Sequence, residues 1–208
     1  MSTHTDRPRR PRARPLSSEE RREVLVDATL RLLREHGRQV TSRQIAEEAR
    51  VAEGTIFRVF ATKDELVDAA IARAFVPGAM VERLAEIDPA LPLEERLVRA
   101  ASVLQQRYRA TFDLMAKVGL VKPPPSTRHA HDREEHLAQL TRMLVEVVGA
   151  DADRLSVPAE DLVHRLRMLV FVGSHPHLSD GRLVTAEDAV HTVLYGLLRT
   201  PAPESQES

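Results

Sequence analysis

Start signals for helices recur in the first third of this sequence. Three times a serine or threonine is followed three residues later by Glu or Gln, which is the spacing of a helix-capping box. The pairs are Ser17 with Glu20, Thr41 with Gln44, and Thr62 with Glu65. Behind each pair, aliphatic residues recur three and four positions apart, which is the period of an amphipathic helix. The pattern predicts a series of helices, the first of which ends at Gly37.

The helical period continues through the rest of the chain. Only 3% of the residues are aromatic and none is cysteine, which excludes an aromatic-rich sandwich and a disulfide scaffold. We therefore expect an all-α fold with an aliphatic core. The further helices are expected near residues 79–87, 93–118, 128–148, 158–173 and 185–199, with a rigid break at 122–126 and a surface loop at 174–184.

Two short helical segments separated by a tight turn lie between the first and last of the three capping pairs. Ile45 and Ala46 mark the buried face of one segment, and Ile56 and Phe60, four residues apart, mark that of the other. Two short helices joined by a few residues are typical of a helix-turn-helix. We expect a helix-turn-helix DNA-binding domain over 17–77, a second helical domain over 78–200, a disordered basic arm at 1–16 and a disordered tail at 201–208.

Charge is distributed unevenly along the chain. Residues 1–76 hold 15 basic and 12 acidic residues, whereas 77–208 hold 15 and 19. The arm alone carries five arginines against Asp6, and we expect it to contact DNA phosphates or the minor groove, with an inert tail as the alternative. No apolar run approaches the length that crosses a bilayer, so we expect a cytoplasmic protein that is not a membrane protein.

Three stretches carry a resemblance to a known family. They are Thr-Ser-Arg-Gln-Ile-Ala at 41–46, Gly-Thr-Ile-Phe-Arg-Val-Phe at 54–60 and Lys-Asp-Glu-Leu at 63–66. The region from about residue 20 to 72 resembles the TetR family of bacterial transcription regulators. The resemblance implies a homodimer that binds double-stranded DNA through its N-terminal domain. It further implies a C-terminal effector-binding and dimerisation domain, in which a small-molecule effector binds and releases the DNA.

Candidate DNA contacts follow from the matching positions. Thr41, at a helix N-terminus, suits a phosphate oxygen, and the resemblance places Arg43 at a base edge, where a guanidinium binds guanine in a bidentate way. Gly54 opens the second helix of the helix-turn-helix, called the recognition helix, and we expect it to let that helix approach DNA closely. By the same resemblance Lys63 contacts phosphate. The full set of predicted DNA-binding residues is Thr41, Arg43, Gln44, Gly54, Thr55, Arg58 and Lys63.

Several positions depart from the family pattern. Phe57 and Val59 stand where side chains that hydrogen-bond phosphate are usual, and Arg50 stands where glycine is usual in the turn. We expect Phe57 and Phe60 to be buried anchors of their helix. A second interpretation of the module remains: Arg43 and the other cations are solvated surface charges, and the protein is a helical scaffold or partner-binding protein that no longer binds DNA.

The second domain offers residues for an effector pocket, each of which has simple core packing as its alternative. The candidates are Leu104, Tyr108, Phe112, Met115, Met143, Val147, Met168 and Phe171. We expect dimerisation through the helices near 160–173 and 186–199, where Gly173 and Gly196 would let two backbones approach closely.

Other chemistry finds little support in the sequence. A four-histidine metal site would have to bring together two pairs of histidines that are far apart in the sequence, His129 with His131 and His175 with His177. No cysteine is available as a further ligand, and we expect no metal or other cofactor. No phosphate-binding glycine loop or nucleophile elbow is present, so we do not expect an enzyme. The resemblance therefore implies a ligand-responsive transcriptional regulator, and we expect a repressor that binds a palindromic operator as a dimer.

Overall fold

The computed structural model describes residues 17–76, 78–120 and 127–196, without the side chains of 127–133. These residues form helices and no strands, as predicted. The chain divides between Arg73 and Ala74 into two compact units, a few residues before the expected boundary after residue 77. The predicted arm (1–16), the tail (201–208), the break at 122–126 and the side chains of His129 and His131 lie outside the described residues.

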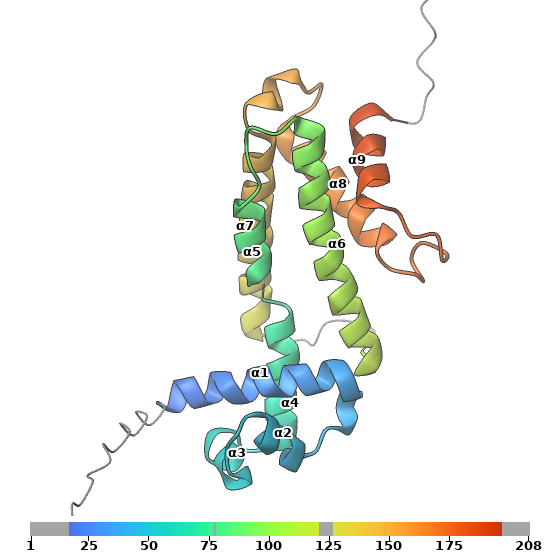
Figure 1. Cartoon of the computed structure of the whole chain (residues 1–208). Coiled ribbons are helices and arrows are strands. Elements are labelled where there is room, and N and C mark those ends of the chain that lie inside the picture. Colours follow the sequence, from blue (N-terminus) through green and yellow to red (C-terminus); the bar gives the residue numbers. More distant parts are fainter. Residues whose placement is uncertain (1–16, 77, 121–126, 197–208) are drawn as a thin grey trace, which may run out of the picture. The chain divides into compact units, whose positions relative to one another are not determined.

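The first unit is built from α1 (Ser18–His36), a 3₁₀ turn (Gly37–Gln39), α2 (Ser42–Glu48), α3 (Glu53–Val59) and α4 (Lys63–Ala74) (Figure 1). Two of the three predicted capping boxes, those at Ser17 and Thr41, are complete: each hydroxyl accepts from the backbone N–H three residues on, and that residue's side chain accepts in return. At the start of α4, Thr62 accepts from the Glu65 N–H at 3.0 Å, while the Glu65 carboxylate accepts instead from the N–H of Ala61.

An aliphatic core holds these four helices together. Leu25 and Leu33 of α1, Ile45 of α2 and Ile56 of α3 have no exposed surface, which matches the predicted three-and-four spacing. Phe60 is also buried, and the Arg22 guanidinium lies 4.4 Å from the centre of its ring. Because α1 contacts both α2 and α3, it holds the two short helices in place.

The second unit surrounds one long helix. Its elements are α5 (Ala79–Ala85), α6 (Leu93–Lys117), α7 (Thr127–Val148), a 3₁₀ stretch (Gly149–Arg154), α8 (Ala159–Gly173) and α9 (Ala186–Tyr195). The long helix α6 contacts each of α5, α7, α8 and α9 (Figure 1). The core is aliphatic, with Leu97, Leu104, Leu144 and Leu166 among its buried side chains.

Two buried features link distant parts of this unit. Arg96 of α6, 5% exposed, donates to the carbonyl oxygens of Pro89 and Val148 and pairs with Asp151, which also accepts from Arg154 at 2.6 Å. Its Nε has no hydrogen-bond partner among the described residues. Arg96 thereby joins the start of α6 to the end of α7.

The second feature is the junction of α8 with the loop that follows it. A Cβ added at Gly173 would lie 2.6 Å from the Cβ of Val184, and the Val184 carbonyl accepts from the Gln105 amide at 2.6 Å. The predicted role of Gly173 in letting a second subunit approach is therefore wrong, because the chain's own loop occupies that space. Gly196, with φ 71°, ends α9.

No helix in the described ranges combines the length and the apolar character that crossing a bilayer would require.

Candidate nucleic-acid interface

A tight turn joins α2 to α3 and sets the helix-turn-helix. The N–H of Val51 donates to the carbonyl of Ala46 at 2.9 Å, and Arg50 has φ 54°, in the left-handed region that glycine adopts most easily. This is the turn position at which the sequence departs from the family pattern. The departure therefore concerns backbone conformation as well as charge.

The exposed face of α3 is the main feature of the module. Ile56 is fully buried and Phe60 follows at the helix end, whereas Gly54, Phe57 and Arg58 are exposed. Since residues three and four apart share a helix face, Gly54 lies on the same exposed side as Phe57 and Arg58. A Cβ added at Gly54 would meet no atom within 4 Å, and its φ is not in the left-handed region. Nothing in the described fold requires glycine at this position.

The prediction that Phe57 is a buried anchor is wrong. Phe57 is 52% exposed, whereas Phe60 is 1% exposed, as predicted. The reason is that α3 ends at Val59 and Phe60 has extended backbone angles, φ −125° and ψ 135°. The helical spacing that would place residues 57 and 60 on one side therefore stops before Phe60.

Thr41 and Gln44 use their polar groups within the chain. The Thr41 hydroxyl accepts from the Gln44 N–H at 3.2 Å and donates to Gln44 Oε1 at 2.9 Å, and the same oxygen accepts from the Thr41 N–H at 2.8 Å. Both residues are exposed. Their visible role is to begin α2, and the predicted phosphate contact stays a prediction.

Arg43 extends from the first turn of α2 and is 82% exposed at its side chain. Its Nε donates to Glu47 Oε1 at 3.0 Å, and this hydrogen bond, aided by the charges of Glu47 and then Glu53, raises the pKa of the guanidinium. Sequence reasoning did not single out Glu47, although its four-residue spacing from Arg43 is that of a helix ion pair. A base contact would require Arg43 to exchange this carboxylate for a base edge.

The other predicted contacts differ in their surroundings. Arg58 is exposed, and no hydrogen bond or ion pair holds it within the described part of the chain. Lys63 is half-buried and donates to the Val40 carbonyl at 3.2 Å, which ties the start of α4 to the start of α2. Thr55 is half-buried, and its N–H donates to Ala52.

Three of the predicted effector-pocket residues form an aromatic group in the second unit. The ring centres of Tyr108 and Phe171 are 5.2 Å apart, those of Phe112 and Phe171 are 5.1 Å apart, and His175 lies 4.4 Å from Phe112. Burial raises the pKa of Tyr108, an effect opposed by the positive charges of Arg167 and Arg107. Leu104 and Val147 are buried, Met115 and Met143 are half-buried, and Met168 is 51% exposed.

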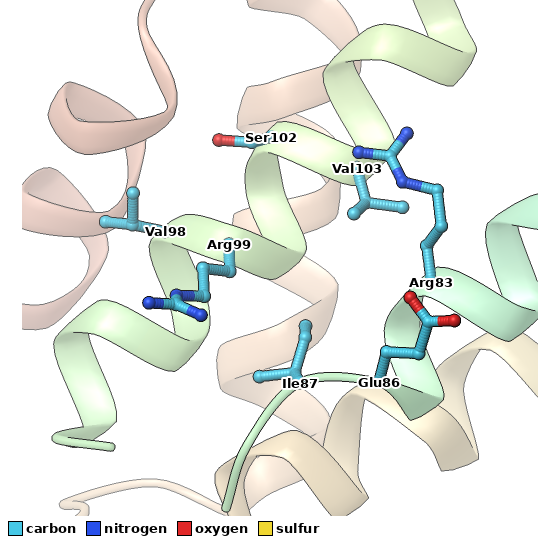
Figure 2. A pocket seen from close by; sticks show the side chains of 7 residues that line it. All are labelled: Arg83, Glu86, Ile87, Val98, Arg99, Ser102 and Val103. Carbon is cyan, nitrogen blue, oxygen red and sulfur yellow. The ribbon is translucent and has the colours of Figure 1, made fainter.

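A surface pocket of about 310 Å³ lies elsewhere in this unit, beside α5 and α6, and none of the eight predicted residues lines it. Ile87, Val98 and Val103 form its apolar part. In Figure 2, Arg83 and Arg99 lie on either side of Ile87. Both are engaged, Arg83 with Gln106 and Arg99 with Glu95 at 2.6 Å. The effector-pocket residues thus stay a prediction.

Metal-ligating side chains do not gather in groups of three or more within the described ranges. His175 and His177 do lie together, with ring centres 5.7 Å apart, and the His177 N–H donates to His175 Nδ1.

Comparison with known proteins agrees with this geometry. Residues 25–70 match the sequence model described as bacterial regulatory proteins, tetR family. Similar solved structures include a transcriptional regulator from Rhodococcus sp. Rha1 (23% identity, covering 83% of this chain and 91% of that one, TM-score 0.56). A tetR-family transcriptional regulator from Streptomyces coelicolor is 20% identical over 86% of this chain and 79% of that one, with a TM-score of 0.55. The fatty acid degradation regulator FadR from Bacillus halodurans is 18% identical over 85% and 96%, with a TM-score of 0.56. At these identities the solved structures share the fold.

Proposed function

The chain is a TetR-family transcriptional regulator, and from this premise we propose that it is a repressor that binds a palindromic operator as a homodimer and leaves it when a small-molecule effector binds. The exposed face of α3 is the observation that most supports binding to DNA. Gly54 leaves open space there, and Arg58 beside it has no partner among the described residues. In a helix-turn-helix, the second helix enters the major groove with its N-terminal residues at the base edges.

Apolar side chains exposed on α8 support the homodimer. Met168 is 51% exposed, Phe171 38% and Val172 37%, and Leu178 and Leu183 in the following loop are exposed as well. Where such side chains form one contiguous patch, they commonly mark a protein–protein interface. A dimer fits DNA half-sites repeated about one turn (~34 Å) or a multiple apart. Sedimentation of the purified protein at micromolar concentration tests this part, and a monomeric mass would remove it.

Effector release requires only a difference in affinity between two conformers. A small molecule that binds better to the conformer with the wrong spacing of recognition helices lowers DNA affinity by that difference. The aromatic group of Tyr108, Phe112 and Phe171 is the proposed place, and the pocket beside α5 and α6 is the competing one. Native mass spectrometry of the protein purified from its own host would detect a retained ligand. Loss of that ligand in Phe112→Ala, but not in Ser102→Ala, would assign it to the aromatic group.

Binding to DNA is tested with the segment upstream of the protein's own gene, by fluorescence anisotropy against random duplex. Arg43→Ala is expected to cost ~1–3 kcal/mol, or about fivefold to 150-fold, on the specific duplex and much less on random DNA. Arg142→Ala in α7 is the control, because Arg142 is also an exposed helix arginine but lies in the second unit and does not line the pocket beside α5 and α6. Equal losses on both duplexes would assign Arg43 to phosphate contact.

A partner-binding protein without DNA affinity is the second candidate. It is favoured by the Glu47 carboxylate on Arg43 and by the exposed apolar ring of Phe57. Absence of any measurable binding to either duplex at low salt would favour it over the proposed repressor.

A further inference from the structure

The ring of Phe57 is an apolar group on a surface that otherwise carries a glycine, an anion (Glu53) and a cation (Arg58). It is 52% exposed in the middle of α3. Its neighbour Ile56 is fully buried and Val59 half-buried, so the core of this unit is complete without Phe57. Because the fold does not bury this ring, it is available to a partner that approaches α3.

The position of Phe57 relative to Gly54 says how close that contact comes. Phe57 is three residues after Gly54 and Arg58 is four, so the two side chains flank the glycine on the same face. Open space surrounds the place of the absent Cβ at Gly54. A partner that approaches the backbone at Gly54 therefore lies within reach of Phe57 on one side and of Arg58 on the other.

The chemistry of the ring limits what it can contact on DNA. It has no donor or acceptor, so a phosphate or a polar base edge packed against it would lose hydrogen bonds to water without replacement. In the major groove one apolar group is displayed by the bases, the C5-methyl of thymine. We propose that Phe57 packs against the methyl group of one thymine in each half-site, and so helps to determine which sequence is bound. The proposal rests on the proposed DNA-binding function.

Removal of the thymine methyl provides the test. Duplexes that the full chain enriches from a random library would be resynthesised with deoxyuridine in place of one thymine at a time, which removes only the methyl. Burial of one methyl predicts about a fourfold loss of affinity at a single thymine position per half-site. Thymines outside the half-sites serve as controls within the same duplex.

Two protein variants, Phe57→Ala and Phe57→Leu, are then measured against the same thymine and deoxyuridine duplexes. Phe57→Ala removes the ring, so the thymine and deoxyuridine duplexes should bind this variant equally well. Phe57→Leu keeps an apolar side chain and should retain part of the methyl preference. Because Phe57 is outside the core, both variants should keep the unfolding midpoint of the unchanged protein.

Each contrary outcome has a distinct meaning. If Phe57→Ala still loses the same factor at the same thymine, the methyl is sensed by another residue and the proposal is overturned. If no thymine is sensitive in the unchanged protein, the ring packs against no methyl and the proposal is overturned. If Phe57→Ala weakens binding to specific and random duplexes alike, the ring contacts the sugar-phosphate backbone and the proposal is again overturned. If the library enriches no sequence, the DNA-binding function itself fails, before Phe57 is tested.

Discussion

At Gly54, folding and DNA binding make opposite demands. Alanine is the better helix former, and its Cβ would meet no atom of the described fold. Gly54→Ala should raise the free energy of unfolding by about 0.5 kcal/mol, the lower end of the helix-interior range, because Gly54 is only the second residue of α3. In the proposed complex the same methyl would stand between the backbone and the DNA, so affinity should fall. Urea unfolding and anisotropy on one preparation measure both effects.

A variant that gained stability and kept full affinity would contradict the close approach of α3 to DNA. Ser156→Ala serves as a control for the binding measurement, since Ser156 is exposed in the other unit and does not line the pocket there.

Arg50 gives a second test at single-residue scale. A residue with a Cβ in this left-handed conformation, φ 54°, destabilises the folded state by roughly 1–2 kcal/mol. Glycine avoids that strain, but its greater freedom in the unfolded chain lowers the free energy of unfolding by about 0.4–1 kcal/mol. Arg50→Gly should therefore stabilise the first unit by about 0.5–1 kcal/mol, as measured by chemical unfolding. Arg50→Ala removes the charge and keeps the Cβ, and should change stability by less than about 0.5 kcal/mol.

The capping pairs and the turn were predictable because they depend on neighbours three or four residues away. Phe57 was not, since its exposure depends on where α3 ends and on the extended backbone at Phe60. Helix ends are set partly by tertiary packing, which the sequence pattern of a seven-residue helix does not contain.

Among the elements, the contact between α8 and its following loop yields the clearest prediction. Gly173→Ala would place a methyl 2.6 Å from Val184 Cβ and would strain the loop whose carbonyl accepts from Gln105. We expect a loss of about 1–3 kcal/mol, the range for overpacked sites, measured by urea unfolding.

Gly54→Ala is the matched comparison, because it is the same substitution in a helix with open space around it. A neutral Gly173→Ala would mean that residues 174–184 shift without cost.

The link between α6 and α7 predicts a pH dependence. The hydrogen bond from Arg154, with further help from Arg96, holds the pKa of Asp151 below its usual range. The stabilisation from its carboxylate is thus present above the unfolded pKa of about 3.9 and is lost as the pH falls through the lower folded value. Asp151→Asn should lower the unfolding midpoint near neutral pH, and the difference from the unchanged protein should shrink below about pH 4.

Asp153→Asn, at an exposed aspartate with no ion pair in the described part of the chain, provides the control. An Asp151→Asn difference that stayed constant with pH would contradict the role of the ionised carboxylate.

The helices of the second unit were predictable from the spacing of apolar residues. The contacts that link them, such as the ion pair of Arg96 with Asp151, were not. Arg96 and Asp151 are 55 residues apart, and a periodic pattern reports only which side of a helix faces inward. For the same reason the pattern selected Tyr108, Phe112 and Phe171 as inward-facing but did not distinguish packed rings from a cavity wall.

For the molecule as a whole, we predict that the basic arm, residues 1–16, contributes to the salt dependence of DNA affinity. Each neutralised phosphate contributes about −0.9 to the slope of log K against log salt. If two or three of the five arginines in residues 1–16 contact phosphate, removing residues 2–15 should flatten the slope by ~2–3 per subunit. Affinity for specific and random duplexes should fall together.

Replacing the five arginines with glutamine keeps the length of the arm and should have the same effect as its removal. An unchanged slope in both variants would identify the arm as an inert tail.

The division of the chain at Arg73 also has a consequence for biosynthesis. The first unit is contiguous, has its own core and is complete before the second is made. At about 5–20 residues per second, translation of the remaining 135 residues takes roughly 7–27 s, far longer than helical domains need to fold. The first unit of a nascent chain can therefore fold on the ribosome before α8 and its exposed apolar side chains have been synthesised.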